Sequence, residues 1–344
     1  MNKKFMSVKG EVLENKMGIT LTHEHLLIDI RNWTIPLPEE TSIGHLVSQK
    51  VSLENRGEIV YMPNYFKDNL VLDDINIAIE ESKSFKSLGG KTIVDLTLDC
   101  IGRDPEALYK ISDETGLNII MGTGKYILSA WSEEDKNKSE NDLINEIINE
   151  FENGAGDMAI RPGVIGEIGV SDIKDPNEIK SLRASSIAQR ELDCALFVHC
   201  PIWEKVNHEI LNILEDAGAN ISRVVMSHLD PTCDDVDFHE SIAKRGAYIG
   251  YESFGTENKA LYGEKFLPSD GQRIIALVDM IKRGYIKQML ISQDIAYKIK
   301  LIKWGGWGYS HILKHIVPRL KQEGITQEQI ETLIIKNPRD LICD

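Results

Sequence analysis

Residues 18–29 read GITLTHEHLLID, and this stretch places two histidines, His23 and His25, at the end of a short apolar run. In a β-strand, residues two apart point to the same face of the sheet. We therefore expect Ile19, Leu21 and both histidines to share one face, which starts apolar and ends with two imidazoles. Imidazole nitrogens are common metal ligands, but two histidines can also stand this close by chance. The rest of the chain must decide between the two interpretations.

Short β-rich runs alternate with longer amphipathic runs along the whole chain. β-branched and apolar residues predict strands at 18–22, 91–98, 117–122, 163–169, 195–199, 223–228, 247–250 and 287–292. The spacing of apolar residues predicts helices at 104–115, 141–152, 176–192, 205–217, 236–244, 272–283 and 309–322. This alternation shows no break in composition, so it predicts an α/β protein with one (β/α)8 TIM barrel, a single domain over residues 1–344. The alternative is an open, doubly wound sheet, which more often carries a glycine-rich turn after its first strand; none is visible here.

Two segments interrupt the alternation. Residues 31–69 contain several prolines and glycines without clean periodicity, and they predict a long loop after the first strand. Residues 251–270 predict a shorter insertion after the seventh strand. Because the loops that follow barrel strands lie at one end of the barrel, we expect both segments to cover its mouth.

Composition limits the classes of function. The 344 residues are 42% hydrophobic and 27% charged, as in ordinary soluble proteins, and the formal net charge of −15 opposes binding to nucleic acid or anionic membranes. No apolar run approaches the roughly 18 residues of a membrane helix, and the first lysines are not followed by the apolar stretch of a signal peptide. The 5 cysteines are scattered and odd in number, which favours reduced thiols and a cytoplasmic location.

Side chains that can bind metal recur where the predicted strands end, and one of them, Glu167, lies inside the predicted strand 163–169. They are His23, His25, Glu167, His199, His228 and Asp294. The carboxyl ends of barrel strands meet at one mouth, where barrel enzymes carry their chemistry, and a buried carboxylate is costly unless it is paired or binds metal. The set exceeds the roughly four ligands of one tetrahedral zinc ion. It therefore predicts two divalent ions that share a bridging carboxylate, with Zn²⁺ as the best match and Mn²⁺, Co²⁺ or Fe²⁺ as alternatives.

The motifs THEHL, GVIGEIG, VHC, SHLD, SQD and KNPRDLI occur in this order over nearly the whole chain. Together they resemble the phosphotriesterase family of the amidohydrolase superfamily, and within it the phosphotriesterase homology (phosphotriesterase-related) proteins. A histidine pair alone is a weak motif, whereas the ordered set across five strands is specific.

The resemblance implies a role for each of the six side chains. The more buried ion would take His23, His25 and Asp294, and the more exposed ion would take His199 and His228, with Glu167 bridging both. In most relatives a carboxylated lysine stands at the bridging position. Asp294 would also be the catalytic residue that accepts the proton of a hydroxide held between the ions.

The function implied is hydrolysis of carboxylic esters or lactones, with promiscuous action on phosphate or phosphonate esters. A true phosphotriesterase and a phospho-sugar lactonase are the enzymatic alternatives. The second is weakened because a basic pair commonly follows the last-strand aspartate in the homology proteins, and here the positions read Tyr297 and Lys298. The non-enzymatic alternative is a catalytically silent metal-binding barrel, although all six ligand positions are present.

Substrate residues are harder to predict than ligands. We expect Tyr126, Tyr251, Lys298 and Trp304 at the mouth of the barrel. The expected partner is a small ester or lactone, with neither nucleic acid nor membrane, and a homodimer is one option for the assembly.

Overall fold

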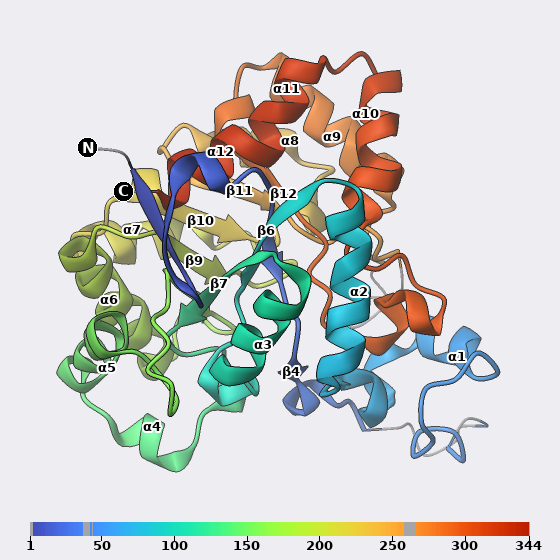
Figure 1. Cartoon of the computed structure of the whole chain (residues 1–344). Coiled ribbons are helices and arrows are strands. Elements are labelled where there is room, and N and C mark those ends of the chain that lie inside the picture. Colours follow the sequence, from blue (N-terminus) through green and yellow to red (C-terminus); the bar gives the residue numbers. More distant parts are fainter. Residues whose placement is uncertain (1–2, 37–41, 43, 258–265, 344) are drawn as a thin grey trace.

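Eight parallel strands form one sheet in the computed structural model. The structure describes residues 3–36, 42, 44–257 and 266–343, and Figure 1 shows how its strands and helices are arranged. The strands are β3 (Ile19–Glu24), β6 (Gly90–Asp95), β7 (Asn118–Thr123), β8 (Val164–Gly169), β9 (Leu196–His199), β10 (Val224–Ser227), β11 (Tyr248–Tyr251) and β12 (Met289–Ile291). They pair in the order β12-β11-β10-β9-β8-β7-β6-β3. The predicted (β/α)8 barrel is confirmed.

The first and last strands of the sheet meet at their carboxyl ends. The N–H of His23 donates to Ser292 Oγ over 3.2 Å, and the N–H of Asp294 donates to the carbonyl of His23 over 3.2 Å. These bonds hold the segment after β12 against β3. Side chains from the first and the last strand of the sheet therefore lie at the same barrel mouth.

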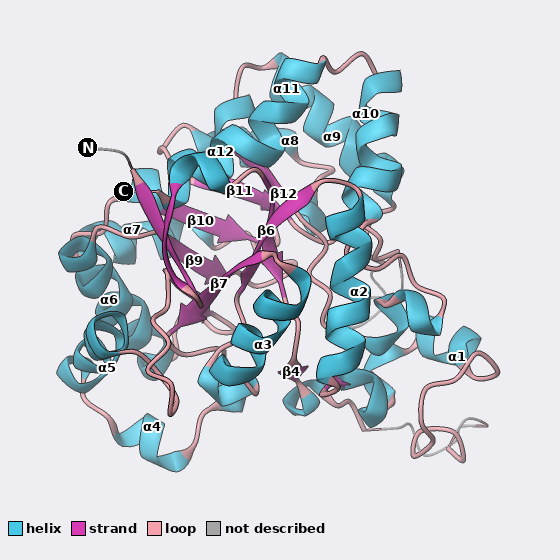
Figure 2. Cartoon of the chain, in the orientation of Figure 1, coloured by secondary structure: helices cyan, strands magenta, loops and turns pink. Residues whose placement is uncertain are grey.

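Helices surround the sheet (Figure 2). The longer ones are α2 (Ile75–Ser87), α3 (Pro105–Thr115), α5 (Glu140–Asn153), α6 (Pro176–Leu192), α7 (Asn207–Asp216), α8 (Val236–Ala243) and α9 (Asp270–Lys282). The shorter ones are α1 (Arg56–Tyr61), α4 (Glu133–Asn137), α10 (Val317–Gln322), α11 (Gln327–Glu331) and α12 (Asn337–Ile342). Asp-Pro pairs begin α3 and α6, where Asp104 and Asp175 cap the first backbone N–H groups and the proline takes the first helical position. Within the described ranges, no helix has the length and apolar composition needed to cross a membrane.

Apolar side chains fill the barrel below the mouth. Strand residues such as Val94, Phe197 and Leu290 form one buried cluster, which also holds Phe5 of an N-terminal hairpin and Leu341 of α12. The hairpin consists of β1 (Lys4–Ser7) and β2 (Gly10–Leu13). Both chain ends therefore help to close one end of the barrel, and the polar side chains gather at the other.

The alternation expected for the first strand is wrong in its first half. Leu21 pairs with Ile93, but Glu24 pairs with Asp95, so β3 carries one extra residue between the two pairs. Leu21 packs in the core cluster that the strands share with the helices. The irregularity reverses the alternation, so the two histidines face the barrel interior although Leu21 faces outward.

The segment after β3 is less irregular than the sequence indicated. It contains α1, and β4 (Ile28–Asp29) pairs with β5 (Val71–Leu72), while part of the predicted loop, residues 37–41 and 43, lies outside the described residues. Trp33 and Pro63 of this segment line the cavity at the barrel mouth. The insertion at 251–270 reaches the same cavity through Thr256 and Leu267, and its residues 258–265 lie outside the described part.

Candidate metal centre

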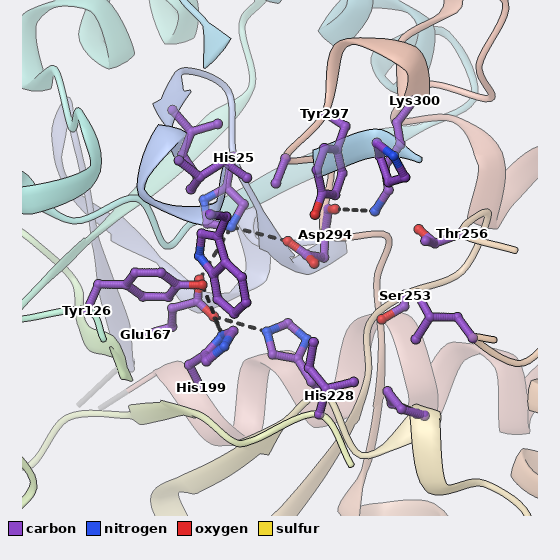
Figure 3. A pocket seen from close by; sticks show the side chains of 18 residues that line it. His25, Tyr126, Glu167, His199, His228, Ser253, Thr256, Asp294, Tyr297 and Lys300 are labelled. Atoms are coloured by element: carbon purple, nitrogen blue, oxygen red, sulfur yellow. Dashed lines mark hydrogen bonds and ion pairs between the residues drawn. The ribbon is translucent and has the colours of Figure 1, made fainter. Parts of the chain in front are cut away.

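Glu167 lies at the centre of a buried group of imidazoles (Figure 3). Its Oε2 is 2.8 Å from Nδ1 of His199 and 3.0 Å from Nε2 of His228. The same oxygen is 3.4 Å from Nε2 of His23, whereas Oε1 is 3.5 Å from Nε2 of His25. One carboxylate therefore contacts four histidines and can divide its two oxygens between two ions.

Asp294 completes one half of this arrangement. Its Oδ1 lies 3.3 Å from Nε2 of His25 and 3.9 Å from Nε2 of His23. Potential ligand atoms within 4.8 Å of one another form three groups: His23, His25 and Asp294; Glu167, His199 and His228; and His23, His228 and Glu252. The first two groups match the assignment that the resemblance implied, while metal binding itself stays a prediction.

Glycine makes room for Glu167. Gly166 has φ +109°, and a Cβ at this position would lie 2.2 Å from the carbonyl oxygen of Phe197. Both the backbone conformation and the close approach require glycine. The glycine before the carboxylate in GVIGEIG thus lets β8 run close to β9 while Glu167 points into the barrel.

Two of the candidate ligands have a left-handed backbone, which is uncommon outside glycine. His228 has φ 59° and Asp294 has φ 48°. The N–H of His228 donates to Oε2 of Glu252 over 3.2 Å, and the N–H of Asp294 is held by the carbonyl of His23. Such strain of about 1–3 kcal/mol per residue persists where the surroundings fix the backbone, and it is typical of functional sites.

Glu252, which the sequence did not lead us to predict, stands behind the ligands. This buried carboxylate follows β11, and its Oε2 lies 3.0 Å from Nδ1 of His23 and 3.8 Å from Nδ1 of His228. It faces the nitrogens that point away from Glu167, and its close contact with Nδ1 of His23 orients that ring. Thr97 does the same for His25, with Oγ1 at 2.9 Å from Nδ1. The available signal was a glutamate directly after an apolar strand.

Glu24, the middle residue of THEHL, holds the turn that carries Asp294. Its carboxylate accepts the hydroxyl of Ser292 at 2.7 Å and the N–H groups of Gln293 and Ile295 at 2.9 and 3.0 Å. Burial raises the pKa of Glu24 to about 7, although these hydrogen bonds oppose the rise. The turn is therefore fixed on both sides of Asp294.

The charges and donors of the site fit divalent ions. Burial alone would raise the pKa of Glu167, but the charges of His23 and His199 outweigh it and hold this pKa well below its ordinary value. Nε2 of His23 is fully buried and has no hydrogen-bond partner among the described residues. A buried nitrogen that makes no hydrogen bond but lies beside carboxylate oxygens is suited to an ion, and nitrogen with carboxylate oxygen is a donor set typical of zinc.

A cavity of about 800 Å³, including its open mouth, lies above the ligands. Its apolar wall includes Ile28, Ile30, Trp33, Pro63, Ile202 and Leu267. Its polar groups, besides the candidate ligands, are Tyr126, Ser253, Thr256, Tyr297 and Lys300.

Of the four predicted substrate residues, Tyr126 lines this cavity, with its hydroxyl 3.4 Å from Nδ1 of His199. Tyr251 does not line it. Its ring packs with Ile249 in the outward-facing core, and its hydroxyl lies 2.7 Å from Nδ1 of His239 on α8. Tyr251 therefore joins the strand to a helix, and we withdraw it as a substrate residue.

Lys298 and Trp304 also lie outside the cavity. Lys298 donates to Asp68 over 2.8 Å, and its ammonium lies 5.7 Å from the centroid of the Trp304 ring. Nε of Arg56 in α1 donates to the carbonyl of Trp304 over 2.8 Å. Both residues thus fasten the segment after β12 to the segment after β3. Lys300, two positions further, is the basic residue that lines the cavity, and the sequence did not distinguish it from Lys298.

Comparisons with known proteins agree with this geometry. A profile of the phosphotriesterase family matches residues 3–342. N-acetyltaurine hydrolase of Dictyostelium discoideum is 35% identical over 98% of this chain and 97% of that protein. A phosphotriesterase-related protein of Nematostella vectensis is 38% identical over 97% and 96% of the two chains. The crystal structure of a resiniferatoxin-binding protein from Rhodobacter sphaeroides superimposes with a TM-score of 0.96 at 36% identity, covering 98% of this chain and 94% of that one. The matched span contains every candidate ligand from His23 to Asp294, and the chain therefore belongs to the phosphotriesterase family and is a hydrolytic enzyme.

Proposed function

We propose that this hydrolase uses two divalent ions, Zn²⁺ in the first instance, to cleave an acyl bond of a small molecule. The observation that carries the proposal is the contact of one buried carboxylate, Glu167, with four histidines below an open cavity. Ions bound there would lower the pKa of water and polarise the oxygen of the scissile bond.

Asp294 is the proton acceptor in this proposal. Burial would raise its pKa, but hydrogen bonding with His25 and the charge of Lys300 hold the pKa below its ordinary value. The carboxylate is therefore ionised at neutral pH and can take a proton from the attacking water and return it to the leaving group. It lies at the edge of the cavity, where a substrate would meet it.

Tyr126 is the hydrogen-bond donor in this proposal. Burial and the charge of Glu167 hold the pKa of its hydroxyl well above the ordinary value, so the group keeps its proton. Because the hydroxyl lies beside His199, it can donate to an oxygen of a substrate placed over the ligands.

We favour an amide as the bond that is cleaved. Full-length relatives at 35% identity carry the name N-acetyltaurine hydrolase, which supports a small N-acyl compound as the substrate. The apolar wall around Trp33 and Ile30 would accept a short acyl group.

Hydrolysis of a carboxylic ester or lactone is the second candidate. Besides Glu167, Asp294 is the one carboxyl group among the described residues that line the cavity. An amide nitrogen must be protonated to leave, so Asp294 would have to serve both as base and as acid, whereas an alkoxide leaves without that help. Action on phosphate or phosphonate esters is expected to be slower in either case.

A substrate panel tests the proposal. The zinc-loaded protein would be assayed with N-acetyltaurine, its acetate-ester analogue O-acetylisethionate, a δ-lactone and a dialkyl aryl phosphate. We expect N-acetyltaurine to be cleaved with kcat/KM of about 10⁴ M⁻¹s⁻¹ or more, and the metal-free protein to be inactive. Rapid lactone cleavage with no amide cleavage would favour the second candidate. Failure of the metal-loaded protein on all four compounds would refute the proposed acyl hydrolysis.

A further inference from the structure

The turn that follows β11 places two hydroxyl groups on one wall of the cavity. Ser253 and Thr256 both line the cavity, and the N–H of Thr256 donates to the carbonyl of Ser253 over 3.0 Å. Thr256 is only 3% exposed, and its Oγ1 has no hydrogen-bond partner within the part of the chain that the structure describes. A buried hydroxyl without a partner costs free energy. It therefore marks a position where a ligand can supply the missing acceptor.

A buried ion network supports this turn from behind. Arg273 is fully buried, and its guanidinium donates to Asp230 over 2.5 Å and to Asp270 over 3.3 Å. Asp270 accepts the N–H of Gly255 at 2.8 Å, and Asp230 accepts the hydroxyl of Ser253 at 3.4 Å. The turn is thus held in place before any ligand binds, which is the condition for selective recognition.

Lys300 brings a positive charge to the same side of the cavity. Figure 3 shows Thr256, Ser253 and Lys300 on one side of the site and Tyr126 on the other. The ammonium of Lys300 donates to the carbonyls of Asp294 at 2.6 Å and Gln293 at 3.2 Å. An ammonium has three N–H bonds, so one remains for a ligand. Lys300 is the one lysine or arginine among the described residues of the cavity wall.

We propose that Thr256, Ser253 and Lys300 form a subsite for an oxyanion that the substrate carries at the end away from the scissile bond. The partnerless hydroxyl of Thr256 and one N–H of the Lys300 ammonium match a sulfonate, carboxylate or phosphate group. Ser253 lies beside them and can turn its hydroxyl to the ligand from its long, 3.4 Å contact with Asp230. The inference rests on the proposed function and narrows it to small acyl compounds with an anionic terminus. It also gives a role to an orphaned hydroxyl that the metal centre does not use.

A matched pair of substrates tests the subsite. N-acetyltaurine carries a sulfonate, and N-acetyl-2-(methylsulfonyl)ethylamine replaces it with a neutral sulfone of similar size. The readout is the ratio of kcat/KM for the anionic compound to kcat/KM for the neutral one. We expect Thr256→Val to lower this ratio by about 10-fold to 100-fold, because a hydrogen bond to a charged group is lost, and Thr256→Ser to restore most of it.

The controls separate recognition from folding. Thr332→Val makes the same chemical change on the outer helices, where Thr332 bonds the carbonyl of Glu328, and it should leave the ratio unchanged. Lys300→Met should lower the ratio of kcat/KM for the anionic compound to that for the neutral compound, as Thr256→Val does. A fall in kcat that is equal for both compounds does not change this ratio. A ratio that is the same in wild type and Thr256→Val would overturn the subsite, as would a ratio near one in the wild type.

Two further arms extend the test. N-acetyl-β-alanine and N-acetyl-O-phosphoethanolamine present a carboxylate and a phosphate in the same frame, so the compound with the highest kcat/KM identifies the oxyanion. If no compound is cleaved, the proposed function fails, and calorimetry with ethanesulfonate then tests the subsite alone. An affinity about 10-fold weaker in metal-loaded Thr256→Val than in wild type would support it, and equal affinity would overturn it.

Discussion

Replacing Asp294 by asparagine would remove the proposed proton acceptor while keeping the size of the side chain and one carbonyl oxygen. In the folded chain, Asp294 Oδ1 lies 3.3 Å from Nε2 of His25 and 3.9 Å from Nε2 of His23. Its backbone N–H is held by His23, and the turn on both sides is held by Glu24. The substitution should therefore leave the fold intact and at least one ion bound.

The expected loss follows from the environment of this carboxylate. A positioned base contributes about 10²–10⁴ in rate, which is about 3–5 kcal/mol of barrier at 1.36 kcal/mol for each factor of ten. His25 and Lys300 lower the pKa of Asp294, even though burial opposes them, so it is a weak base. We therefore expect kcat of Asp294→Asn to fall by about 10², near the lower limit.

The pH dependence sharpens this prediction. Because the pKa of Asp294 lies below its ordinary value, the wild-type carboxylate is ionised from about pH 5 to about pH 9. The loss of kcat should be constant over that interval. Steady-state rates of the zinc-loaded wild type and variant, with metal analysis of both, would measure it. Wild-type kcat in a fully metallated variant, or a loss confined to one pH, would refute the assignment of Asp294 as the base.

Three further predictions concern residues around the centre. Glu252→Gln should weaken ion binding about 10-fold to 100-fold in chelator competition, because Nδ1 of His23 loses its charged partner; unchanged affinity would reduce Glu252 to a packing role. Tyr251→Phe should leave kcat/KM within about twofold and lower the free energy of unfolding by about 1 kcal/mol, because its hydroxyl meets His239 and not the cavity; a tenfold fall in kcat/KM would return it to the substrate site. Burial lowers the pKa of His239 to about 4 from 6.5, although Asp230 opposes the shift. Between these two pKa values the folded state binds fewer protons than the unfolded state, so the free energy of unfolding rises with pH. The neutral His239 therefore contributes about 3 kcal/mol at most, in full above about pH 6.5, and this contribution is lost as the pH falls toward 4. The same pH dependence of the free energy of urea unfolding in wild type and His239→Gln would contradict this prediction.

The strand-end residues could be predicted because the carboxyl ends of all strands in a parallel barrel lie at the same end of the barrel. His199 and His228 each close an apolar run, and Glu167 interrupts one. Since all the strands point the same way, these three side chains had to meet at one mouth. The extra residue in β3 could not be predicted in the same way, because it is defined only by which residues Leu21 and Glu24 pair with on β6.

Loop residues were harder, because no sequence period sets where their side chains point. Lys298 and Lys300 are two positions apart after β12, yet Lys298 binds Asp68 whereas Lys300 reaches back to the carbonyl of Asp294. Because those partners are set by the folded chain, the position of each lysine after β12 could not show which of the two lines the cavity.

The outward direction of the Tyr251 side chain could have been predicted from the alternation of side chains along a strand. In the strand YIGY it shares the face of Ile249, and that face packs outward against the helices. The sequence also gave no assignment for the segment that forms α2, although Asp74 caps its first turn. Glu252 and Thr256 lie in the insertion that follows the short strand β11. Only the folded chain shows that Glu252 faces the candidate ligands and that Thr256 faces the cavity.

The central claim is that two ions share Glu167, and the metal content per chain tests it most directly. Zinc titration of the metal-free protein, followed by elemental analysis after removal of free ions, would be compared for the wild type and Glu167→Gln. Because Glu167 contacts histidines of both ligand groups, the wild type should bind two ions per chain. Glu167→Gln should retain at most one and lose hydrolysis. A fully active wild type that saturates at one ion, or a variant that keeps two ions and full activity, would contradict the claim.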